Sequence, residues 1–268
     1  SGVSRKGASG AVSFSSANPV GNFQSGAMTV KTGSVSESGS SGTLTLSTGT
    51  AAVGSSGQIE IESGSAVGGV GGDISLTVGE TNHAENGGDV YIRAGKTTNT
   101  GKIGGVIGVV SGSGVSSSSG SVVIRSANAV HQHTSGLMVF SSGTTAAGAS
   151  GGVSVGSGVS TGGASGAVDV FSGAVSGANS GATTVVTGDV TGSGSSGVMT
   201  LSTGTAAAGN SGDIEIETGS AVGGVGGDIS LTVGETNHAE NGGDVYIRAG
   251  KTTNTGKIGG VIGVVSGS

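Results

Sequence analysis

The sequence is poor in the residues from which compact domains usually build their centres. Among 268 residues it has no cysteine, no tryptophan, one proline, two tyrosines and four phenylalanines. Without cysteine, no disulfide can brace the fold. A globular core needs large side chains to fill it, yet aromatic residues make up only 2% of the chain. If the chain folds, its interior must therefore be narrow.

Positive charge and long apolar runs are also scarce. Lysine and arginine together number 10 and the net charge is −6, which provides no basic patch for nucleic acid. No apolar run reaches about 18 residues, so we predict no membrane insertion. The chain shows neither an initiator methionine nor a signal peptide, and we interpret it as a mature product or an excised fragment. It contains no catalytic grouping, phosphate-binding loop or dinucleotide fingerprint, and we predict that it is not an enzyme.

A short repeat fills the chain instead. Glycine numbers 61, and the motif Ser/Gly-Gly-x-Φ-x-Φ-x-Ser/Thr-Gly, in which Φ is apolar, recurs about seventeen times at spacings of 15 or 16 residues. Examples are SGTLTLSTG at 41–49, SGQIEIESG at 56–64 and GGDISLTVG at 71–79. Such regularity is typical of a repeat architecture and argues against a disordered Gly/Ser-rich segment.

The alternation within each motif predicts a β-strand with one buried face. Leu44 and Leu46, or Ile59 and Ile61, would point inward, and the glycine that closes the motif would take the positive φ of a tight corner. One such strand cannot bury its face alone, whereas coils stacked about 4.8 Å apart can. We therefore predict an all-β fold without significant helix, a parallel β-solenoid (β-helix) of about 17 stacked 15–16-residue coils. Two units per coil is the open alternative.

The short repeats are themselves grouped into a longer repeat of about 155 residues. Residues 71–113 recur letter for letter at 226–268, and 1–113 as a whole matches 157–268. We interpret the two copies as recent duplicates within a longer array, and the chain as one continuous solenoid over 1–268. Solenoid ends without a cap expose strand edges, which favours end-to-end stacking.

Stacked coils would bring a row of aspartates together. At the first outward position of successive strands, their carboxylates would lie about 4.8 Å apart and repel one another unless a cation bridged them. Because Ca²⁺ takes carboxylate oxygens, the row is a calcium-site hypothesis, and no other cofactor is predicted. The alternative is that each aspartate hydrogen-bonds its own turn. The candidates are Asp73, Asp89, Asp213, Asp228 and Asp244.

Apolar residues also occupy outward positions between residues 104 and 140. Adjacent apolar side chains on the outside of a rod would form a stripe, which usually marks a contact surface. The alternative is a local shift of register that turns some of them inward. The stripe would support lateral association, and it consists of Val106, Val110, Val123, Leu137 and Val139.

The units SGTLTLSTGTAAVGSSGQIEIESGSAVGGVGGDISLTVG resemble the Gly/Ser/Thr-rich tandem-repeat proteins of unicellular algae such as diatoms. The resemblance covers nearly the whole chain, and its motifs are low in complexity. It implies an extracellular, surface-associated protein with no assigned catalytic residues.

These observations favour a structural protein. We predict a segment of an extracellular fibre or cell-surface filament, assembled end to end and laterally with copies of itself. A surface- or glycan-binding adhesin module is the alternative. Ice binding would need a regular hydroxyl ladder, but the hydroxyl pairs Thr43/Thr45 and Ser75/Thr77 are interrupted by Glu60 and Glu62 of the motif between them. Copies of the chain are thus its predicted partners.

Overall fold

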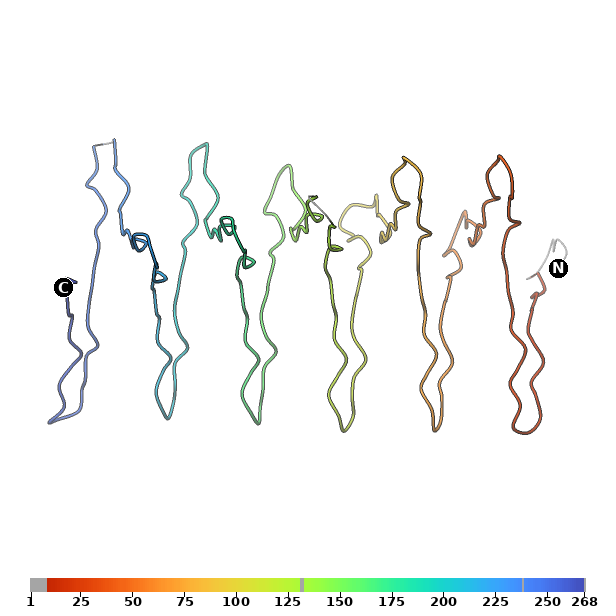
Figure 1. Cartoon of the computed structure of the whole chain (residues 1–268), viewed down its shortest axis with the longest axis horizontal. Coiled ribbons are helices and arrows are strands. Elements are labelled where there is room, and N and C mark those ends of the chain that lie inside the picture. Colours follow the sequence, from red (N-terminus) through yellow and green to blue (C-terminus); the bar gives the residue numbers. More distant parts are fainter. Residues whose placement is uncertain (1–8, 131–132, 238, 268) are drawn as a thin grey trace. The chain divides into compact units, whose positions relative to one another are not determined.

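The chain is made of extended segments and bends. The computed structural model describes residues 9–130, 133–237 and 239–267. It divides into two units, Ser1–Leu137 and Met138–Ser268. Neither unit has an α-helix or a β-strand among its described residues, and the ribbon of each is a plain trace that runs out to a bend and returns (Figure 1).

The predicted parallel β-solenoid is therefore wrong, whether it is built with one unit per coil or with two. No described residue is buried, and there is no hydrophobic core. The side chains expected to point inward lie in solvent: Leu44 is 63% exposed, Leu46 72%, Ile59 48% and Ile61 69%. The all-β assignment fails with the solenoid, because no sheet forms in the described part of the chain.

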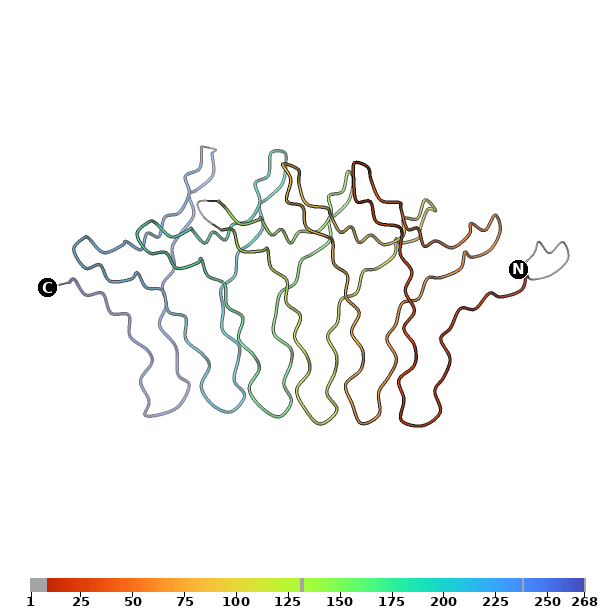
Figure 2. The ribbon, with the colours of Figure 1, turned by 45° about the vertical axis from the view of Figure 1, so that its right-hand side comes forward.

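The physical reason lies in the neighbours that a strand requires. An alternating pattern favours an extended segment, but a sheet also needs a second segment about 4.8 Å away with its backbone groups in register. Successive passes of the ribbon within a unit stay separate (Figure 2). The described residues make five backbone–backbone hydrogen bonds, whereas folded proteins average about one hydrogen bond per residue. The extended segments are therefore left unpaired.

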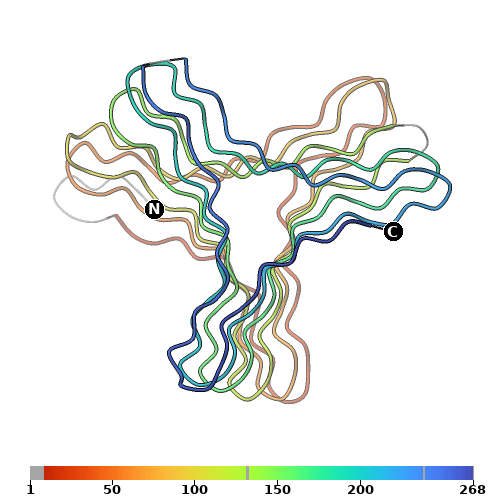
Figure 3. The same ribbon diagram turned by 90° about the vertical axis from the view of Figure 1, so that its left-hand side faces the viewer.

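The described bends lie within the linking residues rather than at the end of the motif, and most of them contain a glycine. Every positive-φ glycine of the described residues lies in such a bend, for example Gly54 at φ 100° and Gly68 at φ 81°. The motif-closing glycines Gly49 and Gly64 do not adopt positive φ, so the predicted corner position was wrong. Seen from the end, the bends mark the outer limits of each excursion of the ribbon (Figure 3).

Below each bend the two sides of the excursion approach each other, at a contact that we call the neck. In most repeats the last Ser or Thr of one motif lies against the second glycine of the next motif. A Cβ placed on Gly57 would lie 3.4 Å from Cγ2 of Thr48, and the Thr48 hydroxyl donates a 3.1 Å hydrogen bond to the Gly57 carbonyl. Thr218 and Gly227 repeat this arrangement, with the same 3.1 Å bond. At these two necks an added Cβ would be in ordinary van der Waals contact, whereas at Gly88 it would lie 2.8 Å from Cγ1 of Val78, too close to fit.

Hydroxyl side chains, not aliphatic ones, are the best-sheltered groups in the structure. All described residues of intermediate exposure are serines or threonines, and most of them stand at necks. They are Thr32, Thr97, Ser111, Ser126, Ser142, Thr187 and Thr252. The local order of each repeat therefore comes from small polar contacts close in sequence.

The geometry of the neck predicts that an engineered disulfide can form across it. A Cβ on Gly57 would lie 3.5 Å from Cβ of Thr48, within the range of about 3.5–4.5 Å that disulfides span. We expect the T48C/G57C variant to oxidise quickly within one molecule at dilute concentration, as measured by non-reducing mass spectrometry. The T48C/G72C variant is the control, because its cysteines belong to different necks. Equal rates for the two variants would contradict the neck.

Candidate assembly surface

The alternating apolar pairs form the largest exposed chemical feature of the chain. In each pair the first side chain is about half exposed and the second is more so, as with Ile214 at 48% and Ile216 at 64%. The residues on the opposite face of the same segments are exposed as well. Both faces of every extended segment are therefore open to a partner.

The accessible surface of the chain is far larger than that of a compact domain. It amounts to 26,496 Å² for a mass of 24.7 kDa. A folded monomer of that mass exposes about 10,000 Å² and a fully unfolded chain about 36,000 Å². The single chain thus leaves roughly 16,000 Å² more surface in solvent than a closed fold would. Obligate interfaces commonly bury about 2,000–5,000 Å², so the available area greatly exceeds what association requires.

Two identical polar clusters stand out from the aliphatic background, and we call them the Asp–Tyr–Arg clusters. In the first, the Tyr91 hydroxyl donates a 2.9 Å hydrogen bond to Oδ2 of Asp89, and the Arg93 guanidinium lies 5.5 Å from the centre of the Tyr91 ring. The cation over the ring is a cation–π contact. All three side chains are exposed.

The second cluster repeats the first in the other long repeat. The Tyr246 hydroxyl donates a 2.8 Å bond to Asp244, and Arg248 lies 5.9 Å from the Tyr246 ring centre. These clusters contain both tyrosines of the chain. The clusters could be predicted from the sequence, because residues two apart share a face of an extended segment. Sequence reasoning placed Asp89 only in the aspartate row and missed this cluster.

The aspartates proposed for calcium are not gathered in the structure. The described ranges contain no group of three or more His, Asp or Glu side chains that could hold a metal ion. Asp89 and Asp244 accept their tyrosine hydroxyls, and Asp73, Asp213 and Asp228 are exposed. A ladder would need stacked coils, which this structure lacks, so calcium binding stays a prediction.

The predicted apolar stripe is fully in solvent. Val106 is 85% exposed, Val110 91%, Val123 75%, Leu137 89% and Val139 68%. Because the opposite faces of these segments are exposed too, the structure does not set the stripe apart from other aliphatic surface. Lateral contact through it stays a prediction.

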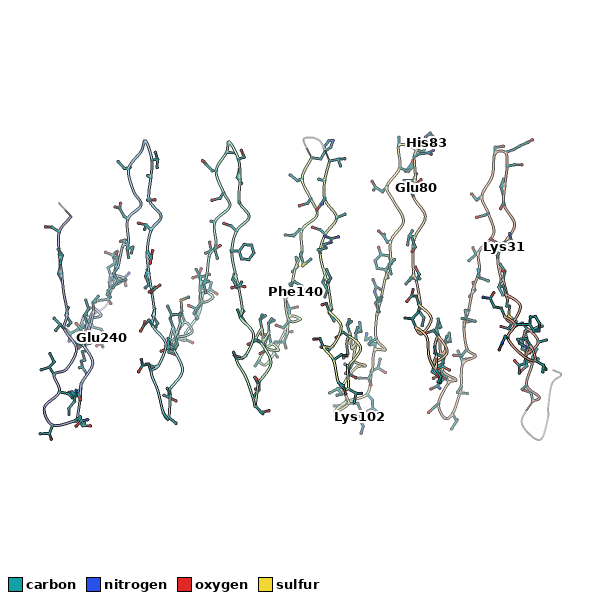
Figure 4. All side chains as sticks on the ribbon, turned by 60° about the horizontal axis from the view of Figure 1, so that its bottom comes forward. Lys31, Glu80, His83, Lys102, Phe140 and Glu240 are labelled. Carbon is teal, nitrogen blue, oxygen red and sulfur yellow. The ribbon has the colours of Figure 1, made fainter. Side chains whose placement is uncertain are left out.

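Two distinctive segments of the repeat lie at its bends. Figure 4 places Glu80 and His83 at the outer end of an excursion, next to the bend at 83–85, and Lys102 beside the turn at 99–101. The Lys102 amide donates to the Asn99 carbonyl at 3.4 Å. The Asn99 amide in turn donates to the Thr97 hydroxyl at 3.2 Å. These polar residues close turns.

The described part of the surface has no concave site, and comparison with known proteins adds no relative. No pocket is present in the described part of the chain, and none of the residues described there forms a helix long and apolar enough to cross a membrane. No protein-family model matches the sequence, and no curated protein or solved structure is significantly similar to it. The candidate site is therefore the exposed repeat surface itself.

Proposed function

We propose that the chain is a structural segment of a long tandem-repeat array that assembles with copies of itself into a fibre or filament. The supporting observation is the exposure of every alternating apolar pair in a single chain, as with Ile59 and Ile61. Apolar surface drives association because its removal from water is favourable, by about 25 cal/mol per Å². A partner is therefore needed to shelter this surface.

A copy of the chain is the partner that fits this surface best. Apolar pairs recur every 15 or 16 residues over the whole length, so a partner with the same spacing can match all of them at once. Backbone N–H and C=O groups of the extended segments are also accessible to such a partner, since few of them pair within the chain. The resemblance to algal repeat proteins supports an extracellular or cell-surface location.

The test is the state of association of the natural chain in solution. We expect sedimentation velocity to show large species that grow with protein concentration, and electron microscopy of the same samples to show fibres. The aliphatic surface of each copy is then covered by others. Monomers alone at millimolar concentration, with no fibres, would overturn the proposed function.

A further inference from the structure

We infer that neighbouring copies in the assembly are displaced by two repeats, so that Glu62 of one copy pairs with Lys31 and Arg93 of its neighbours. The inference rests on the proposed self-association and adds its register and its ionic contacts. The partner is thus a second copy of this chain, recognised through the alternation of charge along one position of the repeat.

The three charged residues occupy the same position of their repeats, directly after the second apolar residue of each motif. Lys31 precedes Glu62 by two repeats, and Glu62 precedes Arg93 by two repeats. All three side chains are exposed, and Figure 4 shows Lys31 on an extended part of the ribbon. In the second long repeat Glu217 and Arg248 stand at the same interval. Charge at this position therefore changes sign after two repeats from Lys31 to Arg93 and again from Glu217 to Arg248, whereas Arg125, two repeats after Arg93, keeps the same sign.

A second copy that runs parallel to the first and is displaced by two repeats can make favourable contacts on both faces of the segments. Segment 58–62 of one copy then lies beside segment 89–93 of the other, and residues two apart keep about the same 6.6 Å spacing in each. Glu62 meets Arg93, Glu60 meets the Tyr91 end of the Asp–Tyr–Arg cluster, and the two aliphatic pairs meet on the opposite face. The cation–π contact of Arg93 leaves guanidinium N–H donors for a carboxylate.

Smaller displacements place more like charges together. Copies without displacement would set every charged residue beside the same residue of the other copy, which is repulsive throughout. A displacement of one repeat would set three like pairs together, Asp73 with Asp89, Asp213 with Asp228 and Asp228 with Asp244, against two attractive pairs, Glu80 with Lys96 and Glu235 with Lys251. Displacement by two repeats leaves two like pairs, Arg93 with Arg125 and Asp213 with Asp244, against three attractive ones. Charge therefore favours the two-repeat register.

The experiment compares assembly of charge-reversed chains and of their mixture, measured as the protein concentration at which half the chain sediments as assemblies. The E62R/E217R variant replaces every attractive contact in the register by a repulsive one. We expect it to need roughly tenfold more protein than the natural chain, as several exposed ion pairs together predict. The K31E/R93E/R248E variant should also assemble poorly, and an equimolar mixture of the two should assemble like the natural chain.

The R125E variant is the matched control for R93E and R248E, because it makes the same Arg-to-Glu change at the same repeat position. Arg125 faces a like charge in the proposed register, so R125E should assemble at least as well as the natural chain. The register would be overturned if the E62R/E217R variant assembled at the same concentration as the natural chain. It would also be overturned if the mixture needed as much protein as each variant alone. In either case, fibres of the natural chain would leave the proposed function standing. A natural chain that stays monomeric would overturn both.

Discussion

The L46D/L201D variant is expected to lose assembly, with the concentration needed rising at least a hundredfold. Leu46 and Leu201 are the second apolar residues of matching motifs in the two long repeats, and they are 72% and 71% exposed in the single chain. If association covers them, each substitution places an unpaired carboxylate in an apolar contact. Such burial costs several kcal/mol per charge, and about 1.4 kcal/mol already corresponds to a tenfold change in affinity.

The matched control moves the same charges by one residue. The T45D/T200D variant adds two carboxylates to the same two segments, on the face that already carries hydroxyls and charges. We expect its assembly concentration to lie within a few-fold of that of the natural chain, because a carboxylate on a polar face stays hydrated. Sedimentation of the two variants side by side separates an effect of position from one of net charge. Equal loss in both would show that the aliphatic face is not the one covered.

The alternating pattern predicted the local conformation of the segments better than their surroundings. Residues two apart do share a face: the Ser75 and Thr77 hydroxyls lie 3.3 Å apart, and the Tyr91 hydroxyl donates a 2.9 Å hydrogen bond to Asp89. That property belongs to the backbone of one extended segment and needs no neighbour. The same pattern predicts that the apolar face is buried against a neighbour. It does not predict which segment, or which molecule, that neighbour is.

The necks show a second kind of information that was present in the sequence and went unused. A Ser or Thr lies nine or ten residues before the second glycine of most following motifs, as with Ser63 and Gly72. A Cβ on Gly72 would lie 3.4 Å from Cβ of Ser63. The positive φ was predicted for the glycine that closes each motif, whereas this glycine lies in van der Waals contact with a hydroxyl side chain across the neck. Close approach and backbone conformation are different reasons for glycine, and a sequence pattern alone does not separate them.

The candidate site could be predicted only as a list of residue types. The five aspartates and the apolar stripe were joined in space by the assumption of stacked coils, so their proximity depended on the solenoid. The Asp–Tyr–Arg clusters depend instead on one short segment, 89–93, and they form without any stacking. Features within one extended segment were therefore predictable, whereas features that join separate repeats were not.

Urea titration of the dilute chain is expected to give a shallow, nearly featureless curve. The slope m scales with the surface exposed on unfolding and is about 1–3 kcal/mol per molar urea for small globular proteins. The single chain already exposes 26,496 Å², so about 9,000 Å² remains to be exposed, against roughly 26,000 Å² for a compact domain of its mass. We expect m to be about one third of that of such a domain.

At concentrations that support assembly, the same titration should become steep, and its midpoint should rise with protein concentration. Association stabilises the assembled state by mass action, which makes the midpoint depend on the amount of protein. Far-ultraviolet circular dichroism at a tenfold series of concentrations follows both regimes in one experiment. A steep transition whose midpoint is the same at every concentration would mean that one chain closes a core by itself. In that case the exposed aliphatic pairs could not be the source of the assembly.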